Sequence, residues 1–299
     1  MHLKKNFPRI EIARKAVQII CLILLSAGFL GLGPIPILLP ILGGLNSQAT
    51  IGEAFSNLQL MLYESMIPWL ALASIFLSAI LLGRVFCGWV CPFGFIQDLV
   101  GYVKRKRKDV SPGTHRGLVM IKYFILILVL FISGTLAVSL ALGIGEGYKQ
   151  ALGIFAPAPF NVLNPADSLF VLLPSIISKL QHGLSEDVVS SLLGAPLVWV
   201  RLFIMVLTLL LAVYIPRGWC RYFCPQGAFL ALISKFGFLG LRREPLRCIK
   251  ATCHACVDVC PMRVRILDLP WEKFSDPECI YCLKCVDVCP TKALKLKFS

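Results

Sequence analysis

The chain has 299 residues, of which 57% are hydrophobic and 15% charged, and its formal net charge is +14. Charged residues make up about a quarter of an average soluble domain, so this composition excludes an ordinary soluble protein and predicts a membrane protein. A positive net charge can indicate nucleic acid as a partner. In a membrane protein, however, Lys and Arg are concentrated in the loops on the cytoplasmic side and so indicate how the chain is oriented in the membrane. We therefore expect no nucleic acid partner.

Four apolar segments come close to the roughly 20 residues that a membrane-spanning helix requires. They cover residues 16–33, 66–86, 118–143 and 197–215. The first segment resembles the apolar part of a signal peptide, but no small-residue cleavage site follows it, which favours an uncleaved helix. The sequence therefore predicts an α-helical polytopic membrane domain with four transmembrane helices over residues 1–239.

Lys and Arg are distributed unevenly around these segments. Residues 1–15 carry five of them, 84–122 carry eight and the chain after Pro216 carries fourteen, whereas 34–65 carry none and 144–196 carry two. The positive-inside rule then predicts that both termini and the basic run 104–108 are cytoplasmic, in a protein of the inner membrane. A fifth crossing near residues 170–177 would place fourteen positive charges outside, so we expect short re-entrant or interfacial helices there.

Residues 240–299 hold eight of the thirteen cysteines, in two copies of one pattern. The copies are Cys253-x2-Cys256-x3-Cys260-Pro261 and Cys282-x2-Cys285-x3-Cys289-Pro290, each with one further cysteine upstream, Cys248 and Cys279. In bacterial ferredoxins, three close cysteines and one from the other copy ligate each [4Fe-4S] cluster. The sequence thus predicts a C-terminal α+β ferredoxin-like domain with two clusters, in repeats at about 240–269 and 270–299.

The ferredoxin pattern assigns four cysteines to each cluster. One set is Cys248, Cys253, Cys256 and Cys289, and the other is Cys260, Cys279, Cys282 and Cys285. Cys248 departs from the pattern, because Lys250 stands where the first cysteine of that copy is expected. Structural zinc sites do not need the repeated x3-Cys-Pro spacing, and a cytoplasmic location disfavours a disulfide scaffold. The apolar runs at 264–269 and 293–298 predict a short strand in each repeat.

A second pair of cysteine motifs follows the second and fourth apolar segments. The motifs are Cys87-x3-Cys91-Pro92 and Cys220-x3-Cys224-Pro225, with Arg84 and Trp89 in the first and Arg217 and Tyr222 at matching positions in the second. Three hypotheses stand for the four cysteines: packing residues, ligands of a third cluster, or redox-active thiols. The arginines and aromatic residues either surround a cluster or a quinone head group, or mark the membrane boundary.

Four predicted helices, two Cys-x3-Cys-Pro motifs and a two-cluster domain together resemble the NapH family of membrane-bound ferredoxin-type proteins. The resemblance rests on residues 86–94, 219–227 and 248–290 and extends over almost the whole chain. It implies a quinol dehydrogenase component that passes electrons from the quinone pool, through partner iron–sulfur or cytochrome c proteins, towards a periplasmic reductase such as nitrate reductase. Related architectures occur in the methylamine-utilisation system, in the regulator of nitrous oxide reduction and in a copper-reducing oxidase-assembly factor.

The residues alone predict a cluster-bearing electron-transfer protein, and quinol as its substrate comes from the resemblance. The alternatives are an iron–sulfur redox sensor and an assembly or copper-reducing factor for a respiratory metalloenzyme. Copper binding is disfavoured, because the segments expected outside offer only Met61, Met66 and His182 as ligands.

Overall fold

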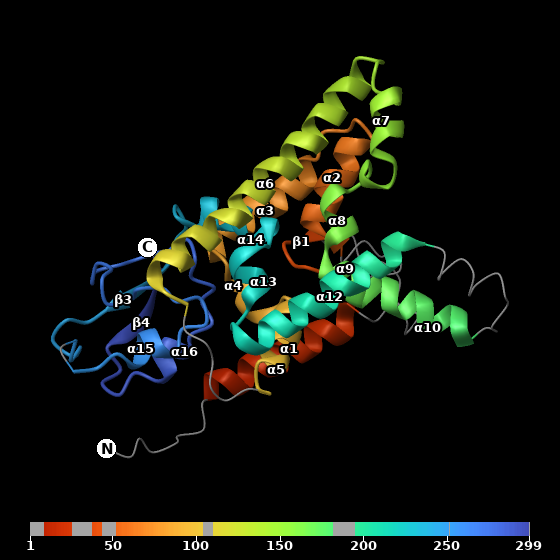
Figure 1. Ribbon diagram of the computed structural model, residues 1–299. Coiled ribbons are helices and arrows are strands. Elements are labelled where there is room, and N and C mark those ends of the chain that lie inside the picture. Colours follow the sequence, from red (N-terminus) through yellow and green to blue (C-terminus); the bar gives the residue numbers. More distant parts are fainter. Residues whose placement is uncertain are drawn as a thin grey trace.

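Helices dominate the computed structural model, which describes residues 9–25, 38–43, 52–103, 110–181, 195–250 and 252–298 (Figure 1). The C-terminal domain, drawn in blue, lies beside the start of the long helix α6, and α7 lies at the far end of that helix. The basic run 104–108 lies outside the described residues.

Two of the described helices are long and apolar enough to cross a membrane, α6 (Pro112–Ala141) and α12 (Pro196–Tyr214). Each begins with a proline, whose missing N–H is not needed in the first turn. Phe124 on α6 and Phe203 on α12 are about two-thirds exposed, as expected of helix faces that meet lipid. These helices match the third and fourth predicted segments.

The first two predicted spans are not confirmed. α1 (Arg9–Leu25) has 17 residues, and residues 26–33 of the predicted segment lie outside the described chain. α3 (Trp69–Leu82) has 14 residues, about 21 Å at 1.5 Å per residue, against a hydrocarbon core of about 30 Å. It ends at Gly83, whose φ of +60° turns the chain into the first cysteine motif.

The two segments expected on the outer side contain helices. Residues 38–63 form strand β1 (Leu38–Leu39), its parallel partner β2 (Gly52–Glu53) and the helix α2 (Ala54–Tyr63). Residues 146–181 form α7 (Glu146–Leu152), η2 (Gly153–Phe155), α8 (Pro159–Leu163), α9 (Pro165–Asp167), η3 (Ser168–Leu172) and α10 (Leu173–Gln181). The chain bends by 85° between Glu146–Leu163 and Pro165–Ile177, which makes this part either a broken span or a re-entrant loop.

Each Cys-x3-Cys-Pro motif forms the same pair of short helices. The helices α4 (Val85–Trp89) and α5 (Pro92–Val100) follow α3, and α13 (Gly218–Tyr222) and α14 (Pro225–Ser234) follow α12. The second helix of each pair packs between the two halves of the chain: α5 against α1 and α12, and α14 against α6 and α3 (Figure 1). The two motifs are therefore interlocked, and each half positions the cysteines of the other.

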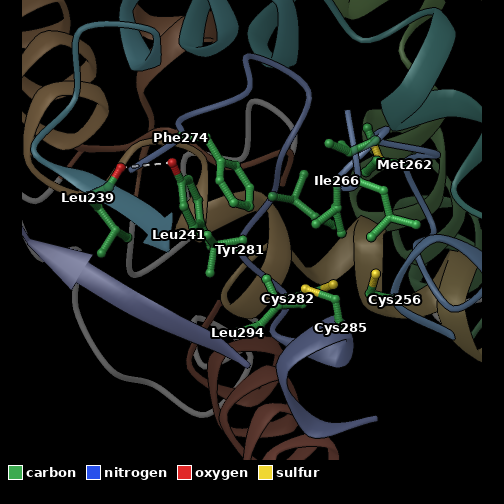
Figure 2. Close-up of a cluster of buried hydrophobic side chains, with 13 residues drawn as sticks. Leu239, Leu241, Cys256, Met262, Ile266, Phe274, Tyr281, Cys282, Cys285 and Leu294 are labelled. Carbon is green, nitrogen blue, oxygen red and sulfur yellow. Dashed lines mark hydrogen bonds between the residues drawn. The ribbon is translucent and has the colours of Figure 1, made fainter. Parts of the chain in front are cut away.

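The C-terminal domain is built around the antiparallel pair β3 (Leu239–Arg243) and β4 (Leu294–Phe298), in which Leu241 lies opposite Leu296. Two single-turn helices, α15 (Ala255–Asp258) and α16 (Lys284–Asp287), come from the two cysteine repeats. Figure 2 shows Leu241, Ile266 and Phe274 in the apolar core that the cysteines adjoin.

Only one of the two predicted strands is present. The strand expected at 293–298 is confirmed by β4, but residues 264–269 form no strand. Arg243 donates hydrogen bonds to the carbonyl oxygens of Leu267 and Leu269 at 3.0 and 3.2 Å. These carbonyl groups accept their hydrogen bonds from a side chain and need no neighbouring strand. The strand that pairs with β4 is β3.

The C-terminal domain rests on the first cysteine motif. Trp89 donates a hydrogen bond from Nε1 to the carbonyl oxygen of Tyr281 at 2.9 Å. Gly88 permits this close approach, because a Cβ atom there would overlap the carbonyl oxygen of Ile280. A hydrogen bond from the Phe238 N–H to the Ile80 carbonyl oxygen, 2.8 Å long, holds the residue directly before β3 against the end of α3.

We expect Gly88→Ala to loosen the C-terminal domain from the membrane part, since the added methyl group meets backbone that cannot turn aside. Overpacking of this kind costs about 1–3 kcal/mol. Hydrogen–deuterium exchange at the Phe238 N–H should become faster in this variant. Gly117→Ala in α6 is the matched control, because a Cβ atom at Gly117 meets nothing within 4 Å. Equal protection of Phe238 in both variants would contradict the expected role of Gly88.

Candidate iron–sulfur sites

Cys248, Cys253, Cys256 and Cys289 line one cavity in the C-terminal domain. Cys256 stands on α15 and Cys289 follows α16, so both repeats contribute. Burial would raise the pKa of Cys289, but hydrogen bonds from the Ala293 N–H and the Thr291 hydroxyl bring it below its ordinary value. This thiol is thereby prepared to act as a thiolate ligand.

Cys260, Cys279, Cys282 and Cys285 line a second cavity. Figure 2 shows the sulfur atoms of Cys282 and Cys285 turned towards each other below Tyr281. Burial raises the pKa of Cys260 to about 11 and that of Cys279 well above its ordinary value. Such thiols keep their protons until a metal replaces them, so metal binding here must release protons.

The loop that carries the second set of cysteines has an unusual backbone. Tyr281 and Leu283 have positive φ angles of 47° and 58°, a conformation that costs about 1–3 kcal/mol for residues other than glycine. The Tyr281 hydroxyl donates a hydrogen bond to the carbonyl oxygen of Leu239 at 2.8 Å, which helps to hold the loop. The strain therefore occurs where Cys282 and Cys285 must face one cavity.

The donor geometry fits clusters better than single ions. Among the described residues, no three His, Cys, Asp or Glu side chains converge closely enough to hold one metal ion. Tetrahedral zinc needs four donors within about 2.3 Å of one point. A [4Fe-4S] cluster instead takes one thiolate at each of its irons, so its ligands are spread around a larger body. Each apolar, cysteine-lined cavity matches this second arrangement.

A third cavity is surrounded by the cysteines of the two interlocked motifs, Cys87, Cys91, Cys220 and Cys224. Residues 40–42, from a segment expected on the outer side, form another wall of it. Cys224 Sγ accepts a hydrogen bond from the Gly227 N–H at 3.2 Å, and Cys220 Sγ accepts one from Gln97 Nε2 at 3.1 Å. The four cysteines form one set, which argues against ordinary packing residues.

Positive charge is buried around the two motifs. Arg14, Arg84, Lys122 and Arg217 are fully buried, and their carboxylate partners within 3.2 Å are Asp98 and Glu278. A buried cation without compensating negative charge is costly. Four buried cations thus share two close carboxylates, and Arg84 lines the third cavity, which favours an anion there; a cluster with four thiolate ligands is such an anion.

Arg84 is the cation that reaches the cavity itself. Its Nη1 donates hydrogen bonds to the Pro277 carbonyl oxygen at 2.9 Å and to the Glu278 carboxylate at 3.1 Å. Its Nε and Nη2 have no hydrogen-bond partner in the described part of the chain, and the side chain lines the cavity beside Gly227. Unused donors on a buried guanidinium are expected where the side chain faces an anion.

The other residues predicted around the motifs do not line the cavity. Arg217 donates from Nε and Nη2 to the two carboxylate oxygens of Asp98 at 2.9 and 2.8 Å. Trp89 contacts the C-terminal domain, as described above. The Tyr222 hydroxyl lies 3.1 Å from His115 Nδ1. These three side chains support the motifs from outside the cavity.

Three functional side chains were missed by the sequence analysis: Asp98, Lys122 and Glu278. Asp98 is the single charged residue of the apolar helix α5, and an isolated carboxylate of this kind is a signal that could have been used. Lys122 pairs with Glu278 over a separation of 156 residues, which leaves no local pattern in the sequence.

Cysteines from all three cavities belong to, or pack against, one apolar core. Cys256 of the first set and Cys282 and Cys285 of the second belong to that core, and Cys87 of the third set packs against it. The second set thus adjoins the third, and the cysteines continue from the membrane part into the C-terminal domain.

Two family comparisons match these same regions. A family described as a 4Fe-4S binding domain matches residues 65–108 and 197–244, which contain the Cys-x3-Cys-Pro motifs. A family described as a 4Fe-4S dicluster domain matches residues 247–294. No solved structure matches the chain.

Several characterised and uncharacterised proteins are similar to this chain. The uncharacterized protein MJ0750 of Methanocaldococcus jannaschii is 30% identical over 234 residues, 76% of this chain and 78% of that protein. The putative electron transport protein YccM of Escherichia coli is 26% identical over 72% of this chain and 51% of its own length. The regulatory protein NosR of Stutzerimonas stutzeri is 29% identical over 69% of this chain and 23% of its own length. The chain belongs to one family with MJ0750, and the 4Fe-4S matches together with the similarity to YccM support a membrane-associated family of iron–sulfur electron-transfer proteins.

Proposed function

We propose that the protein is the quinol dehydrogenase component of a respiratory chain, as in the NapH family. It would take electrons from membrane quinol and pass them, through an iron–sulfur or cytochrome c partner, towards a periplasmic reductase such as nitrate reductase. The observation that carries this proposal is the continuity of three cysteine quartets between the membrane part and the ferredoxin-like domain.

In this proposal each quartet binds one [4Fe-4S] cluster. The first is held by Cys248, Cys253, Cys256 and Cys289, the second by Cys260, Cys279, Cys282 and Cys285, and the third by Cys87, Cys91, Cys220 and Cys224. The third is supported by the free donors of Arg84 at its wall and by the 4Fe-4S family match over both motifs. Redox-active thiols would also be stabilised by a nearby cation, but they would not account for the 4Fe-4S family match over both motifs.

A bound cluster supplies single-electron transfer. The chain's own residues set the conditions for it. Apolar walls such as Leu241 and Phe274 exclude water from the second cavity, and the Gly88 contact brings this cavity close to the third. Hydrogen bonds to Cys220 and Cys224 from Gln97 and Gly227 stabilise negative charge on sulfur, which favours the reduced form.

A redox sensor is the second candidate, because one relative is named a regulatory protein. A sensor would need to accept only as many electrons as its clusters can hold. A dehydrogenase component must instead pass electrons on through many turnovers. Sustained turnover therefore distinguishes the two.

We expect anaerobically purified protein to contain about twelve iron and twelve sulfide per chain, four of each from every quartet. Cys87→Ser and Cys220→Ser should each lose about four iron, and the double variant should lose no more, because both residues serve one cluster. Cys21→Ser is the control, since Cys21 is a lone cysteine on α1 and should leave the iron content unchanged. About eight iron in the parent protein would contradict the third cluster.

A menaquinol or ubiquinol analogue should bleach the cluster absorbance of the protein in lipid nanodiscs, and an added electron acceptor should sustain turnover. Cys87→Ser should lower the rate by at least about tenfold if the third quartet lies on the electron path. If dithionite reduces the clusters but quinol does not, the quinol dehydrogenase proposal is overturned and the sensor is favoured.

We also propose the four-span topology with both termini and the ferredoxin-like domain in the cytoplasm, because 27 of the 30 Lys and Arg residues then lie on one side. Reporter fusions after Ser299 should be active only as cytoplasmic reporters, and fusions at Gln48 and Gln181 only as periplasmic ones. A periplasmic reporter signal after Ser299 would refute this orientation.

A further inference from the structure

The two motif arginines occupy matching positions in the repeat but have different surroundings. Arg217 makes its hydrogen bonds within the membrane part, because its guanidinium donates to both carboxylate oxygens of Asp98 and to the Cys87 carbonyl oxygen. The hydrogen-bond donors of Arg84 face two different sites. Nη1 bonds the loop of the second quartet at Pro277 and Glu278, while Nε and Nη2 remain free beside the third cavity.

The contacts of Arg84 lie very close to the ligands on both sides. Glu278 directly precedes Cys279, and Gly227, which a Cβ atom would bring within 3.0 Å of Arg84 Nη2, donates its N–H to Cys224 Sγ. Arg84 is fully buried, so water does not screen its charge. One positive charge thus stands between the second and the third quartet.

We propose that Arg84 is a positioning residue whose single charge raises the reduction potential of both the second and the third cluster and so couples the membrane part to the ferredoxin-like domain. This inference rests on the proposed function. A nearby cation stabilises the reduced form of a cluster, which carries more negative charge, so one charge between the two quartets raises both potentials together.

The test is a redox titration of each cluster by electron paramagnetic resonance, with the third signal identified by its loss in Cys87→Ser. Arg84→Gln should lower the potentials of the second and third clusters. The expected change is at least tenfold in the ratio of reduced to oxidised cluster at fixed potential, about 59 mV for a one-electron couple. Arg84→Lys keeps the charge and should restore most of both potentials.

Arg243→Gln is the matched control, because Arg243 is also a buried arginine that bonds backbone carbonyls but lines only the first cavity. It should shift the first cluster alone. Glu278→Gln, which removes the carboxylate that Arg84 bonds, should shift the second and third clusters in the opposite direction. This variant keeps the test decisive if Arg84→Gln does not fold.

A shift confined to one cluster, or equal shifts in Arg84→Gln and Arg84→Lys, would overturn the role of Arg84. Twelve iron with unshifted potentials would overturn it while leaving the proposed third cluster intact. A parent protein with about eight iron would instead refute the third cluster, and the coupling role with it.

Discussion

Buried positive charge is the constraint on which the rest of this structure depends. Arg14, Arg84, Lys122 and Arg217 are fully withdrawn from solvent in a largely apolar protein. Asp98 bonds Arg217 and lies 3.2 Å from Arg14, while Glu278 bonds Arg84 and Lys122. Burial acts to raise the pKa of Glu278, but the two cations bring it below its ordinary value, so the carboxylate stays charged. Removing one member of such a group leaves an uncompensated buried charge, which typically costs about 3–5 kcal/mol.

These ion pairs also hold the architecture together. Asp98 on α5 joins α1 to the chain just before α13, and Glu278 joins the C-terminal domain to α6 and to the first motif. Because α5 packs against α12 and α14 packs against α3, the third cysteine quartet forms only when both halves are in place. The repeat has diverged at one decisive point. Gly88 admits the ferredoxin-like loop, whereas the matching residue of the second motif is Arg221, so this close backbone contact forms at the first motif.

Much of the site could be predicted because cysteine ligands obey spacing rules. The spacing of the eight C-terminal cysteines predicted which four would meet, and the structure brings each predicted set to one cavity. The Cys-x3-Cys-Pro repeat indicated that four further cysteines act together, which the third cavity supports. Helix lengths were less predictable, because hydropathy measures apolar content and does not show that Gly83 ends α3 after 14 residues.

The sequence by itself determined the class of the protein, the two cysteine repeats and the strand at 293–298, because composition, spacing and alternation are local properties. Only the tertiary structure decided the roles of Arg84 and Arg217, which the repeat makes look equivalent. Their difference depends on Glu278 and Asp98, which approach from distant parts of the chain. In the same way, Arg243 satisfies the carbonyls of residues 267 and 269 and replaces a strand that the local pattern favoured. Charge pairing and hydrogen-bond satisfaction act between segments that only folding brings together, so no local pattern records them.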